Sequence, residues 1–332
     1  GVEEEDRTTG LGAQQDECKK EDRNCALVDV KEISTVCGMT LMHLAAESGN
    51  VEILEMLADH GLSPNLRHES GLRPLELAVR CGNVGAVGWF LERYGSHQAR
   101  DFVCEDGRKL LNVAADCGNA KTSRLLLAHG ACPDYQPPRE AEVEPGGFLE
   151  ESGMSSWQTP LVSAAGQGFT KVVKILLNYG AQVDLECSAG LTPLTAACVA
   201  GVVPVVKLLV EAGAHPARTC VYRTCTEGRG QGLLYIRDDG EAMECGVGQV
   251  MSPLLVAAGQ GHEEIVEILL DQPGIDLNVQ TEIKRTPLHH ATEDGHVGIM
   301  KKLIKKGADV NHKDIFGKTA LHIACAKGPV SA

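Results

Sequence analysis

Three cysteines in the middle of the chain come closest to the pattern of a metal site. Cys220, Cys225 and Cys245 have the spacing Cys-x4-Cys-x19-Cys, and His215 and His262 are the flanking histidines that could supply a fourth zinc ligand. Structural zinc sites usually contain Cys-x2-Cys pairs, which this segment lacks. The spacing therefore favours plain thiols and leaves a zinc site as the open alternative.

Other residues with reactive side chains do not form a catalytic pattern. The glycines of residues 228–232 lack the Lys-Ser/Thr pair of a phosphate-binding loop, so we expect a turn there. Residues 301–306 contain two lysine pairs between apolar positions, which is typical of the solvated side of a helix. The sequence contains no nucleophile-elbow, zinc-protease or kinase motif. We therefore predict a protein without catalytic activity, bound metal or cofactor.

Composition narrows the class of protein. The 332 residues carry a net charge of −14 and contain 43% hydrophobic residues, 4% aromatic residues and 37 glycines. The acidic balance argues against a nucleic-acid partner, because phosphate binding requires clustered Lys and Arg. No apolar run reaches the ~18 residues of a membrane span, so we expect no membrane insertion. The scarcity of aromatic residues argues against one large globular core.

A Thr-Pro-Leu-His-like block recurs along the chain at a nearly fixed period. The blocks begin at residues 40, 73, 109, 159, 192, 252, 286 and 319. Four of the seven intervals are 33 or 34 residues, and the others are 36, 50 and 60 residues. A fixed period of this length indicates a stacked array, in which each repeat packs on its neighbours and no large core is needed.

The fifth block shows how the sequence builds one repeat. Thr192 can cap a helix that starts at Pro193, where the missing N–H of proline costs nothing. Small residues at 196–197 allow a neighbouring helix to approach closely, and Gly201 can end this first helix. Apolar residues at helical spacing over 205–209 then predict a second helix.

The period and the block resemble those of the ankyrin-repeat family, over about residues 36–328 and in eight copies. The resemblance implies an all-α repeat solenoid, in which each unit is a helix–turn–helix followed by a short β-hairpin. It also implies that His43, His289 and His322 form hydrogen bonds between neighbouring repeats instead of serving as metal ligands or bases. The second and third copies depart from the signature at Arg73, Glu76, Lys109 and Asn112.

The ends of the chain and the two longest intervals define its expected organisation. Residues 1–35 are expected to form an acidic, disordered tail, and residues 36–332 an ankyrin-repeat domain. The eighth repeat stops at Gly328 before any second helix, so we expect it to be truncated and the natural chain to continue. The 50-residue interval contains an acidic, Pro- and Gly-rich insert at about 133–156.

The 60-residue interval contains a second insert at about 216–250. It has two runs of β-forming residues, at 220–224 and 233–237, separated by the glycine-rich turn. This order predicts an extended β-hairpin in which the two runs pair with each other. Inserts in repeat arrays project from one face and often serve binding.

The resemblance implies a protein-interaction scaffold or adaptor that binds a protein partner on its concave face and hairpin tips. The alternative is a regulatory or substrate-targeting arm of a larger protein, such as a ligase, kinase or channel. We expect the protein to be a monomer. Its expected compartment is the cytoplasm or nucleus, because the thirteen cysteines lack the dense spacing of a secreted disulfide framework. Carrying the family's binding positions onto this chain gives the candidates Glu47, Arg67, His68, Glu69, Arg80, Asp116, Gln167, Glu186, Gln260, Glu282, Lys284, Glu293, Asp294, Lys313 and Phe316.

Overall fold

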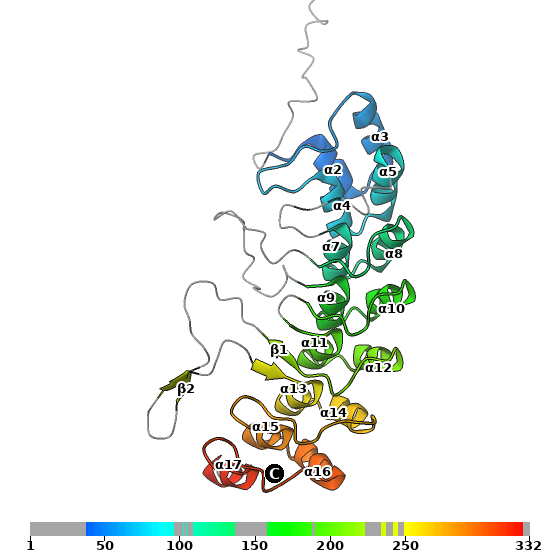
Figure 1. The fold of residues 1–332 in the computed structure, drawn as a ribbon. Helices are drawn as coiled ribbons and strands as arrows, with labels where there is room; N and C mark the ends of the chain where they lie inside the picture. Colours follow the sequence, from blue (N-terminus) through cyan, green and yellow to red (C-terminus); the bar gives the residue numbers. More distant parts are fainter. Residues whose placement is uncertain are drawn as a thin grey trace, which may run out of the picture.

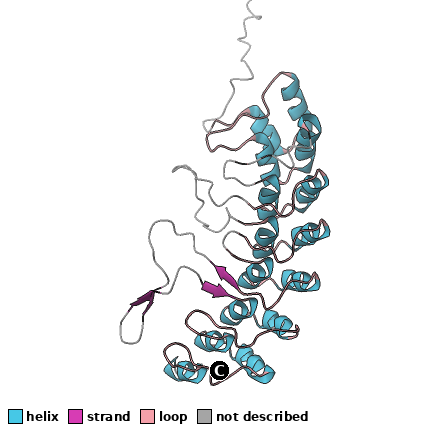
Figure 2. Ribbon diagram, viewed as in Figure 1, coloured by secondary structure: helices cyan, strands magenta, loops and turns pink. Residues whose placement is uncertain are grey.

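A computed structural model describes residues 38–95, 102, 104, 109–136, 158–187, 190–222, 234–236, 242–244 and 249–327. Its helices form two layers that run along one curved stack, with the first helices and the connecting loops on the inner side (Figures 1 and 2). The predicted acidic tail, most of the first insert and the end of the eighth repeat lie outside the described residues.

Fifteen helices are found in the described part of the chain, and they follow the predicted order of two per repeat. The inner layer consists of the first helix of each repeat: α2 (Leu41–Ser48), α4 (Pro74–Cys81), α7 (Leu110–Asp116), α9 (Pro160–Gly166), α11 (Pro193–Ala200), α13 (Pro253–Gly259), α15 (Pro287–Glu293) and α17 (Ala320–Lys327). The outer layer consists of the second helices: α3 (Val51–Asp59), α5 (Val84–Tyr94), α8 (Ala120–Ala128), α10 (Thr170–Asn178), α12 (Val203–Glu211), α14 (Glu263–Leu270) and α16 (Val297–Lys306). The divergent third copy therefore forms both of its helices.

The helix boundaries have the causes that the block predicts. The hydroxyl of Thr192 accepts a hydrogen bond from the backbone N–H of Thr195 at 3.2 Å, and Pro193 occupies the first turn. Gly201 ends α11 with a φ of 71°, which favours glycine. A Cβ at Gly201 would also lie 2.5 Å from Cε1 of His262, so this position combines a backbone and a packing requirement.

The core is one continuous cluster that runs the length of the stack, from Met42 to Ala320. Alanines such as Ala114 and Ala164 are fully buried in the inner layer, where a larger side chain would push neighbouring first helices apart. Leucines such as Leu176 fill the space between the first and second helices. Close helix packing therefore replaces the aromatic bulk that the composition lacks.

The second insert contains strands, but they do not pair as expected. The strand β1 (Cys220–Tyr222) pairs with β4 (Gln249–Met251), and β2 (Leu234–Ile236) pairs with β3 (Ala242–Glu244), both antiparallel. The prediction that the runs at 220–224 and 233–237 pair with each other is wrong. Both ends of an insert must return to the same point of the stack, so its two outermost segments pair and the inner segments pair within them.

No helix in the described ranges is long and apolar enough to span a membrane. Within the same ranges, no group of three or more His, Cys, Asp or Glu side chains could hold a metal ion.

Candidate functional site

The loops that join successive repeats share one hairpin geometry, which positions the candidate residues at their tips. In the hairpin before α4, the N–H of His68 donates to the carbonyl oxygen of Leu72 at 3.1 Å. The same bond over four residues closes the hairpins that start at Cys187, Thr281 and Asp314, at 2.9 Å in each case. The hairpins are therefore equivalent turns, repeated along the inner side of the stack.

In the first and seventh repeats, the histidine of the block connects the first helix to the following hairpin. Nε2 of His43 lies 3.2 Å from the carbonyl oxygen of Leu72, and Nε2 of His289 lies 3.3 Å from that of Lys318. Nδ1 of the same rings accepts from the N–H of Thr40 and Thr286, at 3.2 Å each. The implied role of these two histidines between repeats is confirmed. His322 contacts only its own repeat among the described residues, through the Thr319 hydroxyl and N–H.

Burial keeps these two histidine rings neutral. It lowers the pKa of His43 and of His289 below the ordinary value of 6.5, mainly through desolvation. A neutral ring has one donor and one acceptor nitrogen, which is what a bond to a carbonyl oxygen on one side and an N–H on the other requires. The rings are therefore suited to joining repeats.

In the divergent third repeat, a side-chain amide makes the hydrogen bonds to the following loop that the histidine makes elsewhere. Nδ2 of Asn112 donates to the carbonyl oxygen of Gln158 at 3.0 Å and lies 3.4 Å from that of Tyr135. In the second repeat, the buried carboxylate of Glu76 pairs with Arg80 at 3.2 Å. Asn112 thus replaces the hydrogen bond of the signature histidine with hydrogen bonds of similar length. Glu76 replaces it with an ion pair inside its own helix.

The fourth repeat uses apolar contacts at this level instead. Val162 occupies the histidine position of the fourth repeat and belongs to a second buried cluster with Cys187, Leu191, Ala196 and Cys220. This cluster lies at the base of the β1–β4 ribbon, since Met251 packs against it. The ribbon is therefore anchored on α9, on α11 and on the hairpin that starts at Cys187.

The candidate zinc ligands are not assembled by the described residues. Cys220 is buried, and its thiol lies 3.4 Å from the carbonyl oxygen of Met251 and 3.6 Å from the Thr195 hydroxyl. Burial raises the pKa of Cys220, which disfavours the thiolate that binds metal. Cys225 and Cys245 lie outside the described residues.

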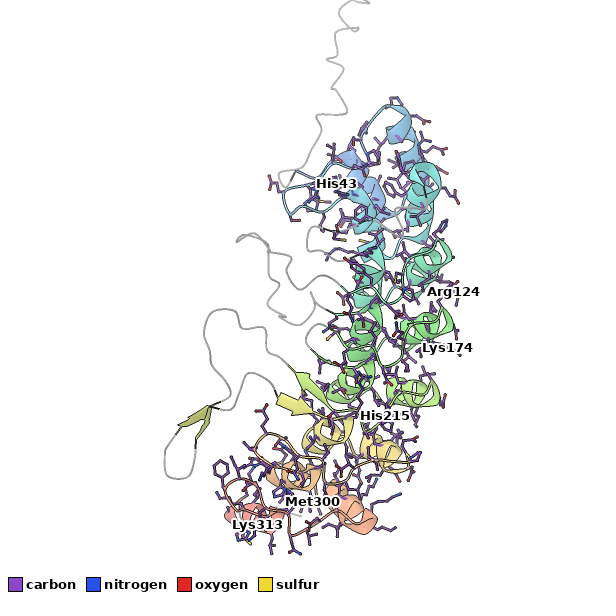
Figure 3. The ribbon with its side chains drawn as sticks, in the orientation of Figure 1. His43, Arg124, Lys174, His215, Met300 and Lys313 are labelled. Atoms are coloured by element: carbon purple, nitrogen blue, oxygen red, sulfur yellow. The ribbon has the colours of Figure 1, made fainter. Side chains whose placement is uncertain are left out.

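Nine of the predicted contact residues have exposed side chains. They lie at hairpin tips or at the ends of first helices: Glu47, Arg67, Glu69, Gln167, Gln260, Glu282, Lys284, Asp294 and Lys313. Lys284 has a φ of 57°, and its N–H donates to the carbonyl oxygen of Thr281 at 2.8 Å. A non-glycine residue in this left-handed region is uncommon, so the chain holds the Lys284 side chain at a fixed place on the tip. Figure 3 shows Lys313 at the inner side of the last repeats.

The other six candidates are partly covered and already have partners. Arg80 pairs with Glu76, Glu186 pairs with Arg218 at 2.8 Å, and Asp116 accepts a hydrogen bond from Ser163. Glu293 pairs with Arg285 at 2.6 Å, and His68 contacts the Ser70 hydroxyl. Phe316 is half-buried, and its N–H donates to Oδ1 of Asp314 at 2.9 Å. These six residues shape the surface and stabilise it.

The sequence reading missed the residue pair that connects the last two hairpins. The side chain of Asp314 is fully buried, and its Oδ1 accepts from the N–H groups of Phe316 and Lys318 at 2.9 Å each. Its Oδ2 lies 3.5 Å from Nε of Arg285, which also binds Glu293. The sequence feature that could have identified this pair is an acid at the start of one hairpin, Asp314, about one repeat after an arginine at the end of the preceding hairpin, Arg285.

Two lysines of the solvated face of α16 also form ion pairs. Lys302 binds Glu263 at 3.2 Å and Glu267 at 3.0 Å, both on α14 of the preceding repeat. Lys306 binds Asp271 at 3.0 Å. These surface ion pairs, which the sequence did not predict, connect second helices along the outer layer.

Comparison with known proteins agrees with this architecture. The family model described as "Ankyrin repeats (3 copies)" matches residues 20–101, 146–220 and 254–332. The chain therefore belongs to the ankyrin-repeat family, whose repeats are protein-interaction modules.

The similar proteins are much longer than this chain and differ among themselves. It is 26% identical over 308 residues to alpha-latrocrustotoxin-Lt1a of Latrodectus tredecimguttatus, covering 83% of this chain and 19% of the toxin. It is 30% identical over 312 residues to the human transient receptor potential cation channel subfamily A member 1, covering 86% of this chain and 25% of the channel. A shorter match, 38% over 82 residues, is to the E3 ubiquitin-protein ligase XBAT33 of Arabidopsis thaliana, with coverages of 24% and 16%. The chain thus spans no more than a quarter of these relatives.

Proposed function

We propose that this chain is a non-catalytic scaffold or adaptor that binds a protein partner on its inner surface. The observation that carries the proposal is the set of exposed polar side chains on equivalent, hydrogen-bonded hairpins, such as Glu282, Lys284 and Lys313. Binding residues held by a rigid scaffold lose little conformational freedom when the partner binds. The core that fixes the hairpins is continuous through the repeats, so the whole row acts as one surface.

The surface carries both signs of charge, which favours a partner of mixed charge over a uniformly basic or acidic one. Near the seventh and eighth repeats, Glu282 and Asp294 lie among Lys284 and Lys313, all exposed. Electrostatic complementarity of this kind supplies specificity and association rate more than raw affinity. We further propose that the chain acts as a monomer in the cytoplasm or nucleus, supported by the free cysteines among its described residues.

A charge-swap variant tests this surface without changing the net charge. Glu282→Lys, Lys284→Glu, Asp294→Lys and Lys313→Glu together alter only exposed side chains. The variant should lose a partner that the unmodified chain retains in proximity labelling and pulldown, while its melting temperature stays the same. The matched control is Lys301→Glu with Lys305→Glu, two exposed lysines on α16 in the outer layer. Retention of every partner by the charge-swap variant would remove the proposed site.

The second candidate function is that of a targeting or regulatory arm within a larger protein. It is favoured by the relatives, whose printed names include a cation channel and a ubiquitin ligase and of which this chain matches only a part. The two proposals share the inner surface and differ in what lies beyond it. Sequencing the natural transcript on both sides of residues 1–332 separates them, since an arm requires a further domain in the same reading frame.

A further inference from the structure

The outer layer carries a concentrated basic patch that the ankyrin architecture does not need. Lys121 and Arg124 lie on α8, and Lys171 and Lys174 lie on α10. All four side chains are exposed, and Figure 3 shows Arg124 and Lys174 on the outer helices, away from the hairpins. Neither helix contains an acidic residue, although the whole chain has a net charge of −14.

Elsewhere on the outer layer, several cations form ion pairs with acids of a neighbouring repeat. Arg93 binds Asp59 at 2.8 Å, and Lys207 binds Glu264 at 2.9 Å. Lys302 binds Glu263 and Glu267 in the same way. The four cations of α8 and α10 make no ion pair with any residue that the structure describes.

The arrangement of the four charges is unfavourable for the isolated stack. Lys121 and Arg124 are three residues apart on one helix, as are Lys171 and Lys174 on the next, so each pair lies on one helix face. The helices α8 and α10 pack against each other, which brings the two like-charged pairs onto adjacent parts of one surface. Mutual repulsion among exposed like charges costs stability, and an anionic ligand would remove that cost.

We propose that Lys121, Arg124, Lys171 and Lys174 form a second interaction surface, which binds a short acidic segment of a partner protein. The second helices on either side of the patch carry exposed acids, namely Glu92 on α5 and Glu211 on α12. A long duplex or a lipid surface would have to cover these carboxylates as well. A short acidic segment fits between them.

The chemistry of the two helices also favours a peptide. Neither α8 nor α10 carries an aromatic residue on which a nucleic-acid base could stack. Their leucines and valines face the core or are partly covered, so no large apolar side chain projects among the cations to enter a bilayer. The contacts that the patch offers are therefore those between its cations and carboxylates, which a compact peptide can make.

Binding of a fluorescein-labelled Glu-rich peptide, measured by anisotropy at low and high salt, tests the proposal. The full chain should bind it in a salt-dependent manner and should not bind the Gln-for-Glu counterpart. Reversing all four cations to Glu should weaken binding by at least about tenfold, because each exposed contact contributes modestly and the reversed charges repel. The control Lys301→Glu with Lys305→Glu makes half of this charge change on α16, the same as Lys171→Glu with Lys174→Glu, and should leave binding unchanged.

A second measurement separates loss of the surface from loss of the fold. Lys171→Glu with Lys174→Glu alone places two acids beside Lys121 and Arg124, so its melting temperature should equal or exceed that of the unmodified chain. Absence of salt-dependent peptide binding, or an equal loss in the α16 control, would overturn the proposal. Tighter binding to phosphatidylserine vesicles or duplex DNA than to the peptide, lost in the fourfold variant, would overturn the assignment of an acidic peptide.

Discussion

Asn112 holds both ends of the first insert, since its Nδ2 lies 3.4 Å from the carbonyl oxygen of Tyr135 and 3.0 Å from that of Gln158. These two carbonyls flank residues 137–157. The repeat on either side of the insert is therefore closed by the same kind of bond that His43 makes to Leu72. The two stems of the insert therefore keep the third and fourth repeats joined across it.

This relationship predicts that the insert is dispensable for stability. Replacing residues 137–157 with a short Gly-Ser linker should leave the urea unfolding midpoint nearly unchanged, since loop length has only a weak effect on closure. Asn112→Ala should lower the free energy of unfolding by about 1–2 kcal/mol, because it removes the two hydrogen bonds of a buried amide. Gln167→Ala, at an exposed position, is the control. Equal stability of Asn112→Ala and the control would contradict this role.

The histidines predict how stability depends on pH. Burial lowers the pKa of His43 and His289 below 6.5, so the unfolded chain takes up protons before the folded one does. Their stabilising contribution is present above pH 6.5 and is lost as the pH falls through the folded-state pKa. Burial lowers the pKa of His290 as well, so it adds to the same trend.

A double variant isolates the two junction histidines. His43→Asn with His289→Asn keeps an amide donor, as at Asn112, but removes the titration. Its unfolding free energy should fall less steeply below pH 6.5 than that of the unmodified chain, measured by urea denaturation across the pH range. Identical slopes for both proteins would show that titration of these two rings does not contribute to the pH dependence of stability.

Alanine substitutions at two glycines with similar backbone conformations distinguish the cost of backbone strain from the cost of side-chain packing. Gly201 and Gly213 both have a positive φ, but a Cβ would meet His262 at the first and nothing within 4 Å at the second. Gly213→Ala should cost about 1–2 kcal/mol, the usual penalty for a left-handed alanine. Gly201→Ala should cost more, since the His262 ring must also move. Equal losses in thermal unfolding would mean that the ring moves freely.

The ion pairs between outer helices predict a small, salt-sensitive effect. Lys302→Ala should lower the free energy of unfolding slightly at low salt, and the loss should shrink at high salt. Lys301→Ala, one residue earlier and exposed, should be neutral. A salt-independent loss at Lys302 would indicate that its aliphatic stem, and not its charge, is responsible.

Most of the fold followed from local sequence signals. Thr192, Pro193 and Gly201 determine where a helix begins and ends, and a fixed period places each such helix against the last. Strand pairing in the second insert was not predictable in this way, because β1 pairs with β4 across about thirty residues with no turn signal that selects the partner. Pairing of that kind depends on where the stack places the two ends of the insert.

The sequence predicted the residues of the candidate surface only in part. Sequence position identified exposed tips such as Lys284 and Lys313, but not that Glu293 and Glu186 are engaged by Arg285 and Arg218. Those partners lie in neighbouring hairpins or at the hairpin's own end, so their proximity depends on the tertiary arrangement. The ion pair of Lys302 with Glu267 was detectable in principle as a charge pair separated by about one repeat.

Hydrogen exchange of the chain, free and bound to a partner retained in the labelling experiment, tests the inner binding surface most directly. Binding at the hairpin tips predicts slower exchange in the segments 281–285 and 313–317 and at the ends of α13 and α15, with the outer helices of the same repeats unchanged. Protection confined to the outer helices or to the two inserts, with the hairpins exchanging as in the free chain, would contradict the proposal.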